Sequence, residues 1–283
     1  MYHSAGEPPC IHHTICHAKM LAALSIEGFA PEQYQGVALP AEQADGIQSF
    51  PTVRTHLLTR HGWHATITDN DYQYLDGGHP TGGALSLLWQ ADWGPVLTGS
   101  MDPYRQNEPN NMQMPAYQFG IACTPRLELA CEGGNAASSN DLTAWLALGD
   151  ADNDSLWAEA CGQLRTAQQV PHGGFRLRYT VQPDGFSISG SSEKPEARFY
   201  LPVVCADGES VFFPEANRAV LQRGALQLTV CADCPLEVPA EYRLADGGIR
   251  RLFNPVGGFQ SVPLCFTAEN DFHLTLSVAN VKK

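Results

Sequence analysis

The chain has 283 residues, of which 43% are hydrophobic and only 17% are charged, and its formal net charge is −13. This composition excludes a disordered or coiled-coil protein. The acidic balance, with no basic face in the sequence, disfavours binding to nucleic acid. No apolar run approaches the roughly 20 residues that cross a bilayer, so no membrane span is predicted.

The nine cysteines are scattered along the chain and lie mostly in apolar, strand-like sequence. Their odd number and their surroundings favour buried free thiols over a disulfide framework. Cys231 and Cys234 have the C-x-x-C spacing of a zinc knuckle or a redox pair. No second pair accompanies them and Pro235 follows at once, so an ordinary turn is the favoured interpretation.

The first predicted element is a helix over residues 12–27, whose apolar residues recur near the helical period and which Gly28 ends. A helix this short needs a surface to pack on. It either lies against the rest of the chain or forms the end of a larger helical domain. We therefore divide the chain into a helical segment, residues 1–35, and a β domain, residues 36–283.

The remainder of the chain reads as strands separated by turn signals. The 26 Gly and 20 Pro residues fit many short strands, and residues 183–185 (Pro-Asp-Gly) give a strong hairpin signal. This spacing predicts a sandwich of antiparallel strands, not βαβ units. Segments 142–148 and 156–164 fit either short helices or strands. The expected strands are 52–58, 64–68, 83–89, 118–123, 126–130, 175–182, 186–189, 198–205, 210–213, 219–221, 225–231 and 272–278.

Four short motifs, taken in order, give the chain a resemblance to a known family. They are residues 12–19 (HHTICHAK), 60–66 (RHGWHAT), 78–89 (GHPTGGALSLLW) and 108–113 (EPNNMQ). The ordered set resembles heparinase II/III-type polysaccharide lyases, in which an (α/α) helical toroid precedes a β-supersandwich. The resemblance implies a mainly β fold here, a two-sheet antiparallel β-supersandwich with an N-terminal helical segment that ends the toroid.

A lyase of that class cleaves glycans that contain uronic acid by β-elimination. It must neutralise the carboxylate, remove the proton at C5 and protonate the leaving oxygen at C4. His and Tyr are suitable acids and bases because their pKa values can be tuned toward neutral pH, and Arg or Asn can stabilise the enolate-like charge. The resemblance thus implies a polysaccharide or oligosaccharide substrate and a secreted protein, periplasmic or extracellular.

His79 is the first catalytic candidate, because the resemblance places it where the sandwich presents a histidine to the cleft, on a Gly-rich loop. His64 and Tyr104 complete the predicted catalytic set. Family members often carry a second His and an Asp for a metal where this chain has Gly82 and Gly83, so a divalent metal is left open. The expected substrate-binding residues are Arg60, Trp63, Glu108, Asn110 and Asn111.

These candidates also have ordinary structural explanations. His13 and His17, four apart on one helical face, could grip a metal or bond locally against the sheet. His64 is equally an ordinary residue at a strand entrance, and residues 108–111 could merely cap a turn. Ser86 lies within Ala-Leu-Ser-Leu, which lacks the nucleophile-elbow pattern of a serine hydrolase.

Two further functions stay open beside the lyase. In one, the chain is a non-catalytic carbohydrate-binding sandwich in which Trp63, Trp89 and Trp93 stack on sugar rings. In the other, it is a structural sandwich whose partner is a helical domain. We expect the helix at 12–27 to be covered by a helical domain or a second subunit.

Overall fold

A computed structural model gives the structure of the chain and describes residues 11–26, 28, 36, 44–69, 80–99, 123–132, 134–151, 154–205, 209–254, 259–268 and 271–281. The prediction of a mainly β chain is confirmed, because these residues form one α-helix, two 3-10 helices and 18 strands. The helices are α1 (Ile11–Ile26), η3 (Ser138–Asn140) and η4 (Ala240–Tyr242). The strands are β1 (Gly46–Phe50), β2 (Thr55–Arg60), β3 (Trp63–Thr68), β4 (Ala84–Gln90), β5 (Gly94–Thr98), β6 (Arg126–Cys131), β7 (Gly134–Ala137), β8 (Trp145–Ala151), β9 (Ser155–Arg165), β10 (Pro171–Gln182), β11 (Gly185–Ser192), β12 (Arg198–Val204), β13 (Ser210–Glu215), β14 (Arg218–Arg223), β15 (Leu226–Ala232), β16 (Leu252–Asn254), β17 (Phe259–Thr267) and β18 (Phe272–Asn280).

The described strands all belong to one hydrogen-bonded sheet, so the expected division into two separate sheets is not confirmed. Within this sheet the pairings follow two antiparallel ladders. The first ladder runs β1-β2-β3-β4-β5-β12-β17-β16, with β6 also beside β12 and β7 beside β6. The second runs β8-β9-β10-β11-β18-β15-β14-β13. A single residue pair, Ala137 with Arg165, joins β7 to β9 and makes the sheet continuous.

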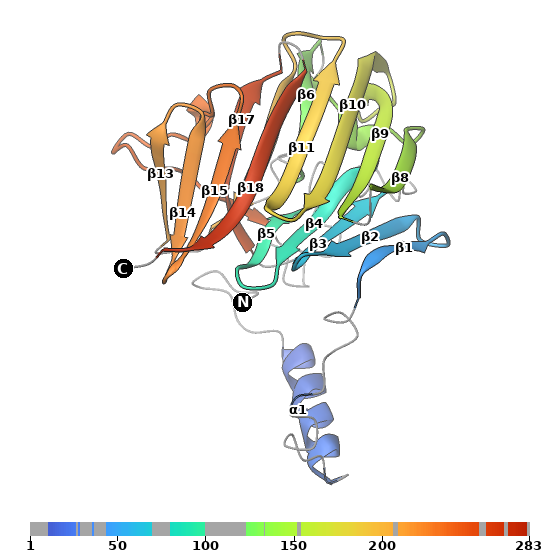
Figure 1. Ribbon diagram of the computed structural model, residues 1–283, viewed down its shortest axis with the longest axis vertical. Helices are drawn as coiled ribbons and strands as arrows, with labels where there is room; N and C mark the ends of the chain where they lie inside the picture. Colours follow the sequence, from blue (N-terminus) through green and yellow to red (C-terminus); the bar gives the residue numbers. More distant parts are fainter. Residues whose placement is uncertain are drawn as a thin grey trace.

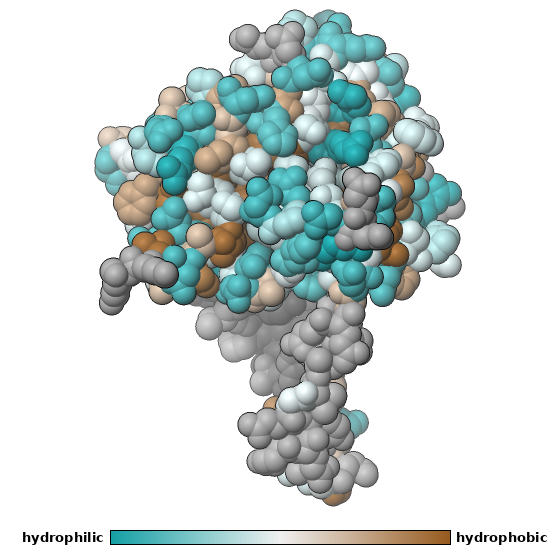
Figure 2. Space-filling model, viewed as in Figure 1, coloured by the Kyte–Doolittle hydropathy of each residue, from teal (hydrophilic) through white to brown (hydrophobic). Residues whose placement is uncertain are grey.

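The two ladders face each other as layers and enclose the hydrophobic core (Figure 1). Trp63 of β3 stacks on Phe186 of β11 with ring centroids 6.1 Å apart. Phe199 of β12 lies 5.0 Å from Phe272 of β18 by the same measure. Because side chains alternate along a strand, each ladder also has an outer face turned away from the core. Figure 2 shows the outer face of the second ladder, where hydrophilic and neutral residues predominate.

The hairpin signal at 183–185 is confirmed, because β10 ends at Gln182 and pairs with Gly185 of β11. A Cβ at Gly185 would collide with the carbonyl oxygen of Leu276, which explains the glycine. The two ambiguous segments are strands, β8 and β9. The strand expected at 52–58 begins at Thr55, and β1 before it was not predicted.

The helix expected at 12–27 is present as α1, a piece of 16 residues. Met20, Leu21 and Ile26 are 64%, 68% and 83% exposed, and Figure 1 draws α1 apart from both ladders. The boundary at residue 35 stays a prediction. Within the described residues, no helix is both long and apolar enough to span a bilayer.

The cysteines that the structure describes are free thiols, as the sequence predicts. Cys231 and Cys234 are among them, so the C-x-x-C pair forms no disulfide. Cys123, Cys205 and Cys265 are buried, the first two in the hydrophobic core.

Candidate functional site

Of the described site candidates, His64 lies on the outer face of the first ladder. Along β3, Trp63, Ala65 and Ile67 are buried in the core, while the residues between them are half-buried. The alternation therefore turns His64 to the outer face.

His64 lies between two neighbours on this face. In the register it pairs with Thr59 of β2 and with Trp89 of β4. The Thr59 hydroxyl is 3.5 Å from Nδ1 of His64, and Trp89 is 40% exposed. Burial lowers the pKa of His64 below its usual value, so its imidazole is neutral at pH 7. A neutral imidazole beside an exposed indole can accept a proton or a hydroxyl hydrogen bond next to a stacked sugar ring.

The expected sugar-stacking role of Trp63 is wrong. Trp63 is 4% exposed and packs on Phe186, so its ring belongs to the core. Trp63 and His64 are consecutive in a strand and must point to opposite faces, so both could not line one site. Trp93 is also buried, under the guanidinium of Arg223. Of these three tryptophans, only Trp89 offers a stacking surface.

Arg60 has a structural role in place of the expected substrate contact. Its Nε donates to Asp45 at 3.0 Å and its Nη1 to Asp150 at 2.9 Å. These two carboxylates raise the pKa of the guanidinium above its usual value. The arginine side chain is 10% exposed. Two carboxylates therefore neutralise the guanidinium charge. Because Asp150 belongs to β8, the Arg60–Asp150 pair also links the first ladder to the second.

The remaining predicted residues lie outside the described residues, namely His79, Tyr104, Glu108, Asn110 and Asn111. The structure does describe the strand ends that flank the segments containing these residues. Thr68, the last residue of β3, pairs with Ala84, the first of β4, and bonds Oγ of Ser86 through its hydroxyl. Gly99, just after β5, donates its N–H to the Ser86 carbonyl at 2.6 Å. Segments 70–79 and 100–122 are thus connected to the same end of the first ladder.

The glycines at the proposed metal position have a packing role. Gly82 and Gly83 have φ values of +73° and +70°, which favour glycine. A Cβ on Gly82 would collide with the Ser138 carbonyl, and one on Gly83 with the Cβ of Ala160. No group of three or more His, Cys, Asp or Glu side chains that could hold a metal occurs in the described ranges.

A second polar cluster lies on the same outer face and was not predicted from the sequence. It centres on Tyr200 of β12, whose neighbours in the register are Arg126 of β6 and Cys265 of β17. The Cζ atoms of Arg126 and Arg198 lie 5.0 and 5.6 Å from the centroid of the Tyr200 ring. Phe199 alternates with Arg198 and Tyr200 and is fully buried, which turns the polar pair outward.

Carboxylates hold both arginines of the cluster. Arg126 Nε donates to Glu128 at 2.7 Å, and Nη2 of Arg198 donates to Glu237. The same Nη2 lies 2.8 Å from the Cys265 sulfur, and burial raises the pKa of that thiol to about 12. The cluster therefore holds neutral and paired groups, of which Arg126 and Cys265 are buried and Arg198 and Tyr200 are partly exposed.

Residues from distant parts of the sequence build this cluster, so no local motif reveals it. The alternation in Ala-Arg-Phe-Tyr-Leu at 197–201 was the available signal, because it places Arg198 and Tyr200 on one face. From His64 to Tyr200 the register counts three strand spacings and about four residues along the strands. With about 4.8 Å per strand and 3.3 Å per residue, the two residues are about 20 Å apart.

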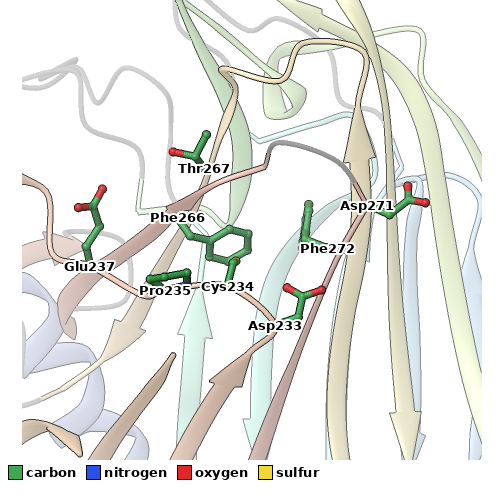
Figure 3. A pocket seen from close by; sticks show the side chains of 8 residues that line it. All are labelled: Asp233, Cys234, Pro235, Glu237, Phe266, Thr267, Asp271 and Phe272. Atoms are coloured by element: carbon green, nitrogen blue, oxygen red, sulfur yellow. The ribbon is translucent and has the colours of Figure 1, made fainter. Parts of the chain in front are cut away.

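A pocket of about 500 Å³ adjoins the cluster through Glu237. Figure 3 shows its side chains, with the rings of Phe266 and Phe272 in contact. Asp233, Glu237 and Asp271 make the lining acidic, which suits neither a uronate nor a sulfate group.

Comparison with known proteins places the chain among the C-terminal domains of polysaccharide lyases. It belongs to the Ulvan lyase C-terminal domain family, whose sequence model matches residues 47–280. A broad-specificity ulvan lyase of Formosa agariphila is 32% identical over 274 residues, which cover 93% of this chain and 42% of that protein. The chain thus spans less than half the length of this relative. The specific resemblance to heparinase II/III-type lyases is not confirmed.

The solved structures that match this chain are distant. The Slr1438 protein from Synechocystis sp. PCC 6803 has a TM-score of 0.45 at 8% identity, covering 84% of this chain and 98% of that one. A putative aldose 1-epimerase from Escherichia coli K12 has a TM-score of 0.41 at 9% identity, covering 80% and 99%. Similarities at this level carry no argument about function.

Proposed function

We propose that the chain is the C-terminal, β part of a polysaccharide lyase that cleaves a uronic-acid-containing glycan by β-elimination. One observation carries the proposal: membership of the Ulvan lyase C-terminal domain family over residues 47–280. The identity of 32% to a broad-specificity ulvan lyase supports ulvan or a similar acidic glycan as the substrate.

The outer face of the first ladder is the proposed glycan-binding surface. His64 supplies a neutral imidazole there and Trp89 an exposed indole beside it. His79 and Tyr104 stay the proposed catalytic residues of the segments that leave this ladder near Ser86. Glu108, Asn110 and Asn111 stay the proposed binding residues of the second of these segments. All of these groups can contact sugar hydroxyls or move protons.

A helical domain or a second subunit is the proposed partner of α1. Its exposed apolar residues Met20, Leu21 and Ile26 support a covered helix, since large apolar side chains gathered on a surface mark interaction sites. A heparinase-like arrangement would give this partner the form of a helical toroid. The two ladders would then be the two layers of the supersandwich.

A carbohydrate-binding function without catalysis is the second candidate. The exposed Trp89 favours it, because an indole can stack on a sugar ring whether or not a bond is cleaved. Under this alternative the protein would retain the glycan without shortening it.

The test uses the intact natural protein with ulvan and with other uronate glycans. β-Elimination leaves a C4–C5 double bond conjugated to the carboxylate, so the ultraviolet absorbance must rise as the chain length falls. His79→Ala should lower this rate by roughly 10²–10⁴-fold, the usual contribution of a general acid or base. Binding without any rise in absorbance would contradict the lyase and support the second candidate.

A further inference from the structure

We infer that Tyr200 is the general acid of the elimination, which donates its phenolic proton to the leaving oxygen from a position beside Arg126 and Arg198. The inference rests on the proposed lyase function and adds a catalytic residue to it. Three properties of Tyr200 carry it: access of the hydroxyl, its protonated form and the charges around it.

The hydroxyl of Tyr200 is accessible and uncommitted. Tyr200 is half-buried, and its oxygen is not among the enclosed polar atoms without a partner. Within the described part of the chain it makes no hydrogen bond. Its neighbour Tyr242 is only 7% exposed. Of these two phenols, Tyr200 is therefore the one that can reach a glycan on the outer face.

The surroundings suit an acid that holds its proton until the reaction. Burial, followed by the Glu128 charge, raises the pKa of Tyr200 above its usual value, so the phenol is protonated at neutral pH. Once the proton has left, the phenolate lies beside two guanidinium groups whose Cζ atoms are 5.0 and 5.6 Å from the ring centroid. Opposite charges at this range favour the ionised form, so the cluster stabilises the conjugate base.

Arg198 can contact the substrate at the same time. Its side chain is 31% exposed. In the described residues only its Nη2 donates to protein groups, Glu237 and Cys265. Nε and Nη1 are thereby left, and either can donate a single charge-assisted hydrogen bond to a uronate carboxylate.

The elimination proceeds as follows when a glycan binds with its C4 oxygen next to the Tyr200 hydroxyl. A neutral imidazole takes the C5 proton. The electron pair of the C5–H bond forms the C4–C5 double bond, and the C4–O bond breaks. The leaving oxygen takes the proton of Tyr200. The imidazolium then returns a proton to the phenolate through water, while His64, about 20 Å away by strand geometry, serves another sugar unit.

The test compares Tyr200→Phe with wild type in the intact protein, since Phe keeps the ring and removes only the proton donor. On the natural glycan we expect kcat to fall by roughly 10²–10⁴-fold with KM little changed. A synthetic uronide with a nitrophenoxy group at C4 needs no proton on its leaving oxygen. On this substrate Tyr200→Phe should turn over at nearly the wild-type rate. Tyr242→Phe, at a buried phenol close to Tyr200, is the matched control and should keep both rates.

The outcomes separate the inference from the function on which it rests. If wild type forms the unsaturated product and Tyr200→Phe does so equally fast, the inference is overturned and the lyase stands. Equal losses on both substrates would show a structural role and would also overturn it. If wild type forms no unsaturated product from any uronate glycan, the proposed function itself fails.

Discussion

Arg60 of β2 and Asp150 of β8 form an ion pair, with 2.9 Å between Nη1 and Oδ1, that crosses from the first ladder to the second. Asp45 binds the same guanidinium from the other side, at 3.0 Å from Nε. The arginine side chain is 10% exposed, so solvent screens these bonds only in part.

Replacing this arginine should destabilise the fold. Asp45 and Asp150 are 65% and 37% exposed, so water can solvate both carboxylates once the arginine is gone. For Arg60→Met we therefore expect a loss of about 1 kcal/mol in the free energy of unfolding. Urea unfolding of both proteins measures it. Arg250→Met, at an exposed arginine, should change stability by less than about 0.5 kcal/mol. A value for Arg60→Met no larger than that of the control would show that the bridge contributes nothing.

The backbone at Gly83 should not tolerate a side chain. Gly83→Ala combines a φ of +70° with a collision against the Cβ of Ala160. Gly224 has a φ of +59° with nothing within 4 Å of an added Cβ. Gly224→Ala therefore causes only the backbone strain of a positive φ, without a steric collision. We expect about 1–2 kcal/mol for Gly224→Ala and a larger loss for Gly83→Ala. Thermal melting ranks the two variants, and equal melting temperatures would refute the close approach.

Stability should depend on pH through His64. Because burial lowers the pKa of His64 in the folded protein, the unfolded chain binds the proton more readily. Its contribution is fully present above the unfolded pKa of about 6.5. It is lost as the pH falls from there through the lower folded pKa. Melting temperatures at pH 7.5 and 5.5 should therefore differ less in His64→Asn than in wild type. Identical pH dependence in both would contradict the assignment.

Truncating Trp89 should mainly weaken glycan binding, whereas truncating Trp63 should mainly lower stability. Trp89→Ala should weaken binding of an acidic glycan by about tenfold, the loss of one aromatic contact. It should cost less stability than Trp63→Ala because the Trp89 side chain is 40% exposed. Trp63→Ala should cost about 3–5 kcal/mol of stability, since its ring fills the core against Phe186. Calorimetric titration and urea unfolding check the pair. Unchanged glycan affinity in Trp89→Ala would remove the stacking role.

The sequence predicted what depends on local patterns. Alternation and turn residues indicated the β class, the hairpin at 183–185 and the helix before Gly28. The sequence did not show which face of β3 is buried, because the alternation alone does not tell whether Trp63 or His64 points into the core. Contacts between distant residues were also hidden. Arg60 meets Asp150 and Tyr200 meets Arg126 only because the ladders bring four separate strands together.

The origin of the oxygen at the newly formed chain ends tests the central claim most directly. The intact protein would digest ulvan in water enriched in heavy oxygen, and mass spectrometry would compare the products with those formed in ordinary water. β-Elimination breaks the C4–O bond without adding water. In short digestions, analysed before the new reducing end exchanges its hemiacetal oxygen with water, the account therefore predicts unsaturated products without solvent oxygen. Products that carry one heavy oxygen per cleaved bond and lack the double bond would show hydrolysis and contradict the account.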